Sequence, residues 1–272
     1  MIEDHPRGIF VDHNNRIVVA PRLKNYILVW SKDNVQSQWN LIFQTHEHPG
    51  LFITTDDDVY FQKDGGDGQI YKCTNNTSSC ILVKDFTAKC FSVFVDNNNT
   101  LYCSTASCHS VYAISLNASG NAIVTVAGRG SGGSASDQLN DPHGIFVNTN
   151  FDLYVADFGN SRIQRFRSGE KNGTTVAGLG IPRNLNLGNP SDVVLDASDY
   201  LYVVDRRNNR VIQVGQGDYQ CIAGCFGGNG ATSWQLNHPE LIRFDSYGNI
   251  YIADTDNHRI QKFILLTNCC GE

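Results

Sequence analysis

The chain alternates short apolar runs with polar turns. In residues 141–166, which read DPHGIFVNTNFDLYVADFGNSRIQRF, the runs GIFV and DLYVA lie on either side of a polar turn, and SRIQRF follows a second turn. Short runs rich in Val, Ile, Tyr and Phe, bounded by Asn, Asp and Gly, are typical of β-strands joined by hairpins. No longer segment has the periodicity of an amphipathic helix. The pattern therefore predicts an all-β protein.

The same phrase occurs six times along the chain. Aligned on a proline that Cys90 replaces in the third copy, its cores span residues 5–30, 48–73, 89–114, 141–166, 189–214 and 238–263. A further apolar run follows five of the cores, in segments 39–43, 80–85, 123–128, 174–178 and 220–224. A unit of about 40–50 residues with up to four short strands is typical of a β-propeller blade. One such blade cannot bury both of its faces, so we expect all six to stack in one ring.

The consensus of the copies, P-x-G-[IL]-x-[VF]-D…[LI]-Y-[VI]-A-D…N-x-R-[IV]-Q-x-F, resembles the NHL repeat. The resemblance is strong in copies four to six and partial in copies one to three. It implies a six-bladed β-propeller and makes residues 1–272 a single domain. The sixth copy has no evident fourth run. We therefore expect either that the closing strand is missing from this fragment or that blade six has three strands, although an unpaired edge is a liability.

Copies four to six share an Asp and an Arg at one spacing. An Asp that ends one strand and an Arg that starts the next can pair across the hairpin and order its turn. Their recurrence in every well-conserved copy favours a scaffold role. The pairs are Asp157 with Arg162, Asp205 with Arg210, and Asp254 with Arg259.

Copies one to three lack this pair of residues. Variable turns on a rigid scaffold are where binding residues tend to lie. The first half of the ring is therefore where the sequence predicts contact with a ligand. The equivalent positions hold Pro21 and Tyr26, Lys63 and Gly68, and Thr105 and Ser110.

A second set of positions directly follows the reference proline of each copy. If the inner strands line a central channel, these side chains form a ring near one of its mouths. Such a polar mouth could hold a carboxylate or a peptide end, or form a satisfied structural network. These positions hold Arg7, Gly50, Phe91, His143, Ser191 and Glu240, and all of them except Gly50 are the ligand-binding candidates.

Metal chemistry has a precedent at this mouth. The peptidyl-amidoglycolate lyases, relatives of the NHL propellers, hold a zinc there with histidines from several blades. Three imidazoles around an open position are what such chemistry requires, and only His143 is available in this chain. The acidic turns 54–60 and 63–69 could bind calcium, but they lack the ligand spacing of an EF-hand loop. We therefore expect no cofactor, with zinc or calcium as the ions to test.

The cysteines and sequons point to an oxidising compartment. None of the nine cysteines forms a CxxC motif, which argues against zinc ribbons and thioredoxin-like centres. The pairs close enough to bridge within a hairpin are Cys73 with Cys80, Cys103 with Cys108, and Cys221 with Cys225. Asn-x-Ser/Thr sequons occur in expected turns at Asn75, Asn76, Asn98, Asn117 and Asn172. Together they favour a secreted glycoprotein, with the cytosol as the alternative.

The charge of the chain narrows its partners. The 21 basic and 27 acidic residues give a net charge of −6, with no basic block for a nucleic-acid backbone. No apolar run approaches the roughly 20 residues of a membrane helix. The sequence thus favours a non-enzymatic propeller that binds a protein, a peptide or a glycan. The alternatives are a metal-dependent lyase or hydrolase that uses the central channel, and an RNA-binding NHL domain, which the acidic charge disfavours.

Overall fold

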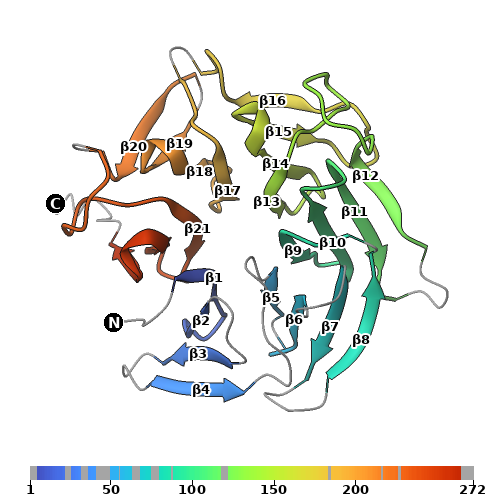
Figure 1. Cartoon of the computed structure of the whole chain (residues 1–272), viewed down its shortest axis with the longest axis horizontal. Helices are drawn as coiled ribbons and strands as arrows, with labels where there is room; N and C mark the ends of the chain where they lie inside the picture. The colour runs from blue at the N-terminus through green and yellow to red at the C-terminus, as the bar shows by residue number, and fades with distance from the viewer. Residues whose placement is uncertain are drawn as a thin grey trace, which may run out of the picture.

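The structure is a computed structural model whose strands form six antiparallel sheets. The sheets are arranged in a ring, with the first strand of each sheet near the centre and the later strands progressively further out (Figure 1). The six-bladed propeller predicted from the repeats is confirmed. The structure describes residues 5–21, 26–31, 36–40 (backbone), 50–54, 56–62, 68–74, 80–86, 88–117, 122–182, 185–215, 217–225 and 228–264.

The first three blades contain four strands each, ordered from the centre outwards. Blade 1 consists of β1 (Pro6–Val11), β2 (Ile17–Pro21), β3 (Tyr26–Trp30) and β4 (Gln36–Asn40). Blade 2 consists of β5 (Leu51–Ile53), β6 (Val59–Gln62), β7 (Gln69–Cys73) and β8 (Cys80–Asp85). Blade 3 consists of β9 (Ser92–Val95), β10 (Thr100–Thr105), β11 (Ser110–Ser115) and β12 (Val124–Gly128).

The last three blades are more alike. Blade 4 consists of β13 (Pro142–Val147), β14 (Leu153–Asp157), β15 (Arg162–Phe166) and β16 (Thr174–Ala177). Blade 5 consists of β17 (Pro190–Leu195), β18 (Leu201–Asp205), β19 (Arg210–Val214) and β20 (Tyr219–Ala223). Blade 6 consists, within the described residues, of β21 (Pro239–Phe244), β22 (Ile250–Asp254) and β23 (Arg259–Phe263). A single 3₁₀ turn joins the second and third strands of each of these blades: Phe158–Asn160, Arg206–Asn208 and Thr255–Asn257.

One strand differs from its prediction. The apolar run 39–43 was expected to form the outermost strand of blade 1, but β4 begins at Gln36 and pairs its Asn40 with Tyr26. Its sequence, QSQWN, is mostly polar. An outermost strand has one neighbour and an outer edge toward solvent, so its hydrogen-bond register need not follow an apolar pattern.

The hydrophobic core is divided into six clusters, one at each boundary between neighbouring blades. Between blades 4 and 5, for example, Ile163 and Val203 are both fully buried in one cluster. Five of the boundaries hold nine to twelve buried apolar residues each. Each blade therefore buries one of its two faces against the blade before it and the other against the blade after it. This is why the repeats fold as a ring.

The boundary between blades 6 and 1 closes the ring with a smaller cluster of five buried residues. Polar contacts supplement it. The Thr255 hydroxyl donates to the Pro6 carbonyl at 3.0 Å, and the Ser246 amide donates to the Asn15 side chain at 2.8 Å. Blade 6 has three strands within the described residues, and these contacts join it to the start of the chain.

The turn after each inner strand is ordered by the last side chain before it. In blade 3, Asp96 Oδ1 accepts hydrogen bonds from the amides of Asn98 and Thr100, at 2.9 and 2.8 Å. Short polar side chains that bond the backbone two and four residues on stabilise such turns. The equivalent residues are Asp12, Thr54, Asp96, Asn148, Asp196 and Asp245.

Candidate functional site

The Asp–Arg pairs of blades 4 to 6 form a buried network. Arg162 Nε donates to Asp157 Oδ2 at 2.7 Å, and the same carboxylate accepts from Asn160 Nδ2 and from the Asn140 amide. The side chain of Asp157 is fully buried, and burial raises its pKa although these donors oppose the shift. Arg210 and Arg259 contact their aspartates at 2.8 and 2.7 Å. These contacts fix the hairpin turns and leave few hydrogen-bonding groups of the Asp and Arg side chains available to a ligand.

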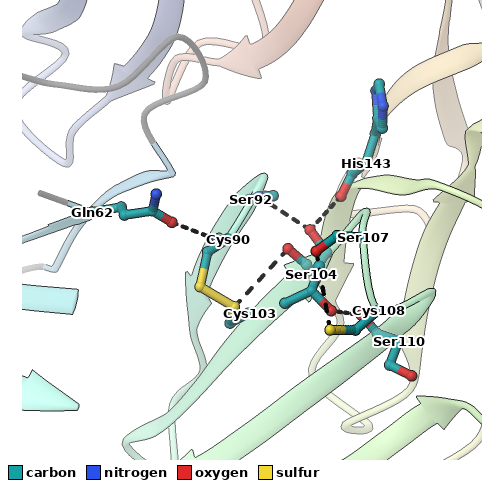
Figure 2. Close-up of a disulfide and its surroundings, with 10 residues drawn as sticks. Gln62, Cys90, Ser92, Cys103, Ser104, Ser107, Cys108, Ser110 and His143 are labelled. Carbon is teal, nitrogen blue, oxygen red and sulfur yellow. Dashed lines mark hydrogen bonds between the residues drawn. A yellow bond between two sulfur atoms is a disulfide. The ribbon is translucent and has the colours of Figure 1, made fainter. Parts of the chain in front are cut away.

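The cysteine pairs are partly as expected. Cys73 bonds to Cys80 and Cys221 bonds to Cys225. The expected pair of Cys103 with Cys108 is wrong, because Cys103 is bonded to Cys90 and Cys108 is free (Figure 2).

The register of blade 3 explains this correction. Cys103 is fully buried on β10 opposite Val93, close to the start of the inner strand. Its Cα lies 5.3 Å from that of Cys90, within the range for a disulfide. Cys108 lies beyond the strand, in the turn between β10 and β11. Cys108 is nearer to Cys103 along the sequence, but strand pairing in blade 3 brings Cys90 nearer to Cys103 in space. Sequence proximity therefore predicted the wrong partner.

The expected mouth ring is assembled from internal contacts. His143 is stacked between Phe91 and Phe158, with ring centroids 3.6 and 3.9 Å away. Its backbone carbonyl accepts a hydrogen bond from the Ser104 hydroxyl at 2.6 Å (Figure 2). The Asp141 carboxylate lies 3.5 Å from His143 Nε2. His143 is only 8% exposed, so the stack and these partners occupy most of its surface.

Glu240 organises the opposite side of the mouth. Its Oε1 accepts from Arg206 Nε at 3.1 Å and lies 3.6 Å from Arg7 Nη1, which links blades 5, 6 and 1. The hydroxyl of Ser191, which is fully buried, donates to the Glu240 carbonyl at 2.8 Å. The five mouth candidates thus contact one another in two groups, Phe91 with His143 and Arg7 with Ser191 and Glu240. Arg206 belongs to the second group and was missed by the sequence argument, because it lies in a turn.

A row of phenylalanines on the inner strands was also missed. Phe10, Phe52, Phe94 and Phe146 make successive ring contacts at 5.2, 5.0 and 5.5 Å between centroids, with interplanar angles of 70°, 56° and 65°. Tilted and edge-to-face geometries of this kind are favourable for aromatic pairs. The signal was present in the sequence, since Phe10, Phe94 and Phe146 each stand four residues after the reference residue of their copy and Phe52 stands three residues after its own.

An open groove lies on the face that carries the turns after the inner strands of blades 1 to 3. Its volume is about 800 Å³, and residues from each of these turns line it, among them His13, Asp56 and Asn97. It is also lined by Phe52 on β5 and by Leu82 on β8, so it extends across blade 2 from the innermost to the outermost strand. We call this the blade 1–3 groove. The sequence pointed to this half of the ring but not to a groove.

Charged side chains occupy the middle of the groove. Lys72 Nζ lies 2.5 Å from Asp58 Oδ2, and this hydrogen bond raises the pKa of Lys72 above its usual value. The ammonium also lies 5.6 Å from the centre of the Tyr60 ring. Asp56 is exposed to solvent and Asp96 is buried in the wall. Three carboxylates and one ammonium leave the lining with a net negative charge.

Zinc and calcium, the ions named for testing, would be held by His, Cys, Asp and Glu side chains. Within the described residues, no group of three or more of these side chains is arranged to hold a metal. In the acidic turn 54–60, Asp57 pairs with Arg16 and Asp58 pairs with Lys72. Most of the second acidic turn, 63–69, lies outside the described residues.

Two of the sequons face each other at the groove. Asn117 lines the groove and its side-chain nitrogen donates to the Asn98 carbonyl at 3.1 Å. Asn172 is exposed in blade 4, and its side-chain oxygen accepts from Ser136 at 3.2 Å. Asn75 and Asn76 lie outside the described residues. Their glycosylation stays a prediction.

The described residues contain no helix long and apolar enough to span a bilayer.

A sequence profile of the NHL repeat matches residues 139–166 and 236–263. NHL repeat-containing protein 3 of Mus musculus and that of Homo sapiens are each 29% identical to this chain over 142 residues, which cover 46% of the chain and 40% of the relative. The match therefore spans less than half of these relatives.

Solved structures share the fold at low identity. Virginiamycin B lyase from Staphylococcus aureus superposes with a TM-score of 0.64 at 14% identity, over 96% of this chain and 85% of the lyase. A chain of the nidogen/laminin complex superposes with a TM-score of 0.62 at 17% identity, over 94% of this chain and 92% of that one. An enzyme and a component of a protein complex thus have the same architecture, so the fold does not decide the function. The repeats, the six-bladed ring and the NHL matches together support placing this chain among the NHL-repeat β-propellers.

Proposed function

We propose that this propeller is a non-enzymatic recognition module that binds a protein or peptide partner in the blade 1–3 groove. The observation that carries the proposal is the groove itself. Its volume of about 800 Å³ falls within the range of ligand sites, and its lining combines apolar and charged side chains. It lies in the blades whose turns lack the Asp–Arg network.

The side chains at the channel mouth are engaged with one another, in contrast to the open groove, and this supports the groove as the binding site. Glu240, with 2% exposure, is held by arginines from two other blades, and His143 is covered by two aromatic rings. Side chains engaged in this way stabilise the meeting point of the blades. The alternative, a metal-dependent lyase or hydrolase in the channel, has a direct test: stoichiometric zinc or calcium in the purified protein would favour it over a recognition role.

The three disulfides support an oxidising compartment, and with it a secreted protein. A count of free thiols under native and denaturing conditions tests this part. At most three of the nine cysteines should react, Cys108 and the two cysteines outside the described residues, Cys269 and Cys270. Nine reactive thiols would contradict the disulfides and favour the cytosol as the location of the protein.

A selection experiment tests the binding role. The native, disulfide-bonded protein is used to select from displayed libraries of random peptides and of small folded domains, and the affinity of the selected binders is then measured on two variants. Leu82→Arg changes a groove residue that is 50% exposed, and Val124→Arg changes an outer-strand residue that is 52% exposed and does not line the groove. We expect Leu82→Arg to weaken binding at least about tenfold and Val124→Arg to leave it unchanged. Binders that tolerate Leu82→Arg would contradict the groove as the recognition site.

A further inference from the structure

The blade 1–3 groove has three zones in a fixed order, set by the order of strands in blade 2. The sheet order β5-β6-β7-β8 places Phe52 innermost, Asp58 and Lys72 in the middle, and Ile81 and Leu82 at the rim. The inner zone is aromatic, the middle zone is charged, and the outer zone is aliphatic. A ligand that fills the groove must match this sequence of environments.

The outer zone is unusually apolar for an outermost strand. Ile81 is 63% exposed and Leu82 is 50% exposed, both on β8. Ile81 and Leu82 pair in regular register with Lys72 and Tyr71, and the register shift between β7 and β8 follows them at Val83. The Cys73–Cys80 disulfide fixes the start of this strand, directly before Ile81. The apolar rim of the groove is therefore held in place covalently.

The middle zone selects by charge. Lys72 and Asp58 neutralise each other, while Asp56 from the turn above adds an exposed carboxylate. Asp96 in the blade 3 wall adds negative charge behind it, with its oxygens bonded to backbone amides and to Tyr102. The lining holds no other Lys or Arg. A cationic group is therefore the complement of this zone, and an anionic group would meet repulsion.

The spacing of the zones fits an extended peptide. Neighbouring strands lie about 4.8 Å apart, so the path from β5 to β8 is roughly 14 Å long. An extended chain rises about 3.3 Å per residue and points alternate side chains to one side, so residues i, i+2 and i+4 span roughly 13 Å on one face. Three side chains of one peptide strand thus match the three zones.

We infer that the groove takes an extended segment of a partner protein with the pattern apolar-x-basic-x-apolar, where the basic residue is Lys or Arg. This inference rests on the proposed function and specifies the chemistry of the ligand. The first or last apolar side chain would contact Phe10 and Phe52, and the other would contact Ile81 and Leu82. The central cation would lie beside Asp56 and Asp58.

A position-scanning library of fluorescein-labelled heptapeptides tests the inference by fluorescence anisotropy. We expect Lys or Arg at the centre and Leu, Ile or Phe two residues to either side to give the tightest binding, with central Glu at least about tenfold weaker. Moving the basic residue by one position should cost a similar factor, because its side chain would then point away from the groove.

Two charge-reversed proteins provide the matched comparison. Asp56→Lys and Glu170→Lys each replace an exposed acid with a lysine, but only Asp56 lines the groove. We expect Asp56→Lys to abolish the preference for a basic centre and Glu170→Lys to retain it. Equal effects of the two variants would overturn the inference.

The failures are distinguishable. Groove-dependent binding, lost in Leu82→Arg, that shows no preference for a basic centre overturns the peptide pattern and leaves the recognition role intact. Binding that Leu82→Arg does not affect contradicts the proposed function as well. If no sub-library binds while selected folded domains bind through the groove, the linear-peptide occupant is wrong.

Discussion

The two halves of this ring are stabilised in different ways. In blades 4 to 6, an aspartate at the end of the second strand is buried without exposed surface and binds the arginine that begins the third strand. In blades 2 and 3 that network is absent from the described residues, and the Cys73–Cys80 and Cys90–Cys103 disulfides connect strands instead. Neither disulfide closes the turn between the second and third strands, so that turn is free to differ from blade to blade.

This difference concerns the turns between the second and third strands, whereas the groove is lined by the turns after the inner strands. The Asp–Arg network requires Asn, Arg and backbone carbonyls at set positions. In blade 4, Arg162 also donates to the carbonyls of Ser134, Ala135 and Gln138 in the segment between blades. Blades 1 to 3 carry no such requirement, and β5 in blade 2 has only three residues. The groove crosses blade 2 on the side of the turns after the inner strands, which is the side away from the Asp–Arg turns.

The largest expected effect comes from breaking the network in the regular half. Arg162→Ala leaves the Asp157 carboxylate buried without its cation, and losing one partner of a buried pair costs about 3–5 kcal/mol of unfolding free energy. Urea denaturation measures it. The control is Arg129→Ala, whose side chain is 66% exposed in its ion pair with Asp137 and should cost less than about 1 kcal/mol. Similar losses for the two variants would contradict the scaffold role.

Removing a disulfide from the irregular half should cost somewhat less. The double variant Cys90→Ser/Cys103→Ser opens a link across 13 residues, and chain entropy predicts a loss of about 3 kcal/mol. The matched variant Cys221→Ser/Cys225→Ser opens a link across 4 residues in the regular half, with a predicted loss of about 2 kcal/mol. Thermal denaturation of both checks the order. A greater loss from the second variant would show that the disulfides do not stabilise the irregular half in particular.

A contact between a tyrosine hydroxyl and an aspartate occurs in each half of the ring. The pH dependence of stability that it causes is the next largest expected effect. The Tyr202 hydroxyl lies 3.3 Å from Asp196 Oδ2, and burial, helped by this carboxylate, raises its pKa from 10.0 to about 12. Burial and Asp96 raise the pKa of Tyr102 in blade 3 in the same direction.

Because the folded-state pKa is raised, the stabilisation from these tyrosines is fully present below about pH 10 and is lost as the pH rises toward 12. Ultraviolet titration should find both phenols ionising only above pH 10 or on unfolding, and Tyr202→Phe should reduce the alkaline loss of stability. A folded protein in which every tyrosine ionises near pH 10 would disprove the burial of both groups.

The smallest expected effect concerns the seam of the ring. His5 and His238 precede the inner strands of adjacent blades, and both contact Asp256, at 3.8 and 2.8 Å. Since these side chains are about a third exposed or more, Asp256→Ala should lower the unfolding free energy by less than about 1 kcal/mol. Hydrogen exchange of the β1 and β21 amides measures the local opening. Faster exchange confined to these strands is expected, whereas global unfolding would show that the seam limits the stability of the whole ring.

The repeats made most of the fold predictable. Each predicted core covers the first three strands of its blade to within a residue or two at its end, because the apolar positions that stack neighbouring blades recur in every copy. The Asp–Arg spacing identified the contacts of Asp157 with Arg162 because the two residues lie on paired strands. The fourth strand of blade 1 was misplaced because an outer strand buries little and leaves a weak pattern.

The candidate site was less predictable. The mouth ring was located by aligning the repeats, but the stacking of His143 between two rings depends on Phe158, in a turn that the alignment did not single out. The groove could not be predicted, since it is a space between segments and not a motif. Its wall combines Phe52, Lys72 and Leu82 from separate strands of one blade with Asn97 from the next.

The sequence by itself determined that this protein is a ring of six β-modules with a regular and an irregular half, because strand periodicity and turn chemistry are local and are repeated along the chain. Only the tertiary structure decided which cysteine bonds to Cys103, how the mouth side chains satisfy one another, and where an open groove remains. The disulfide depends on strand pairing within blade 3, whereas the mouth and the groove depend on distances between residues far apart in the chain, which the packing of one blade against the next sets.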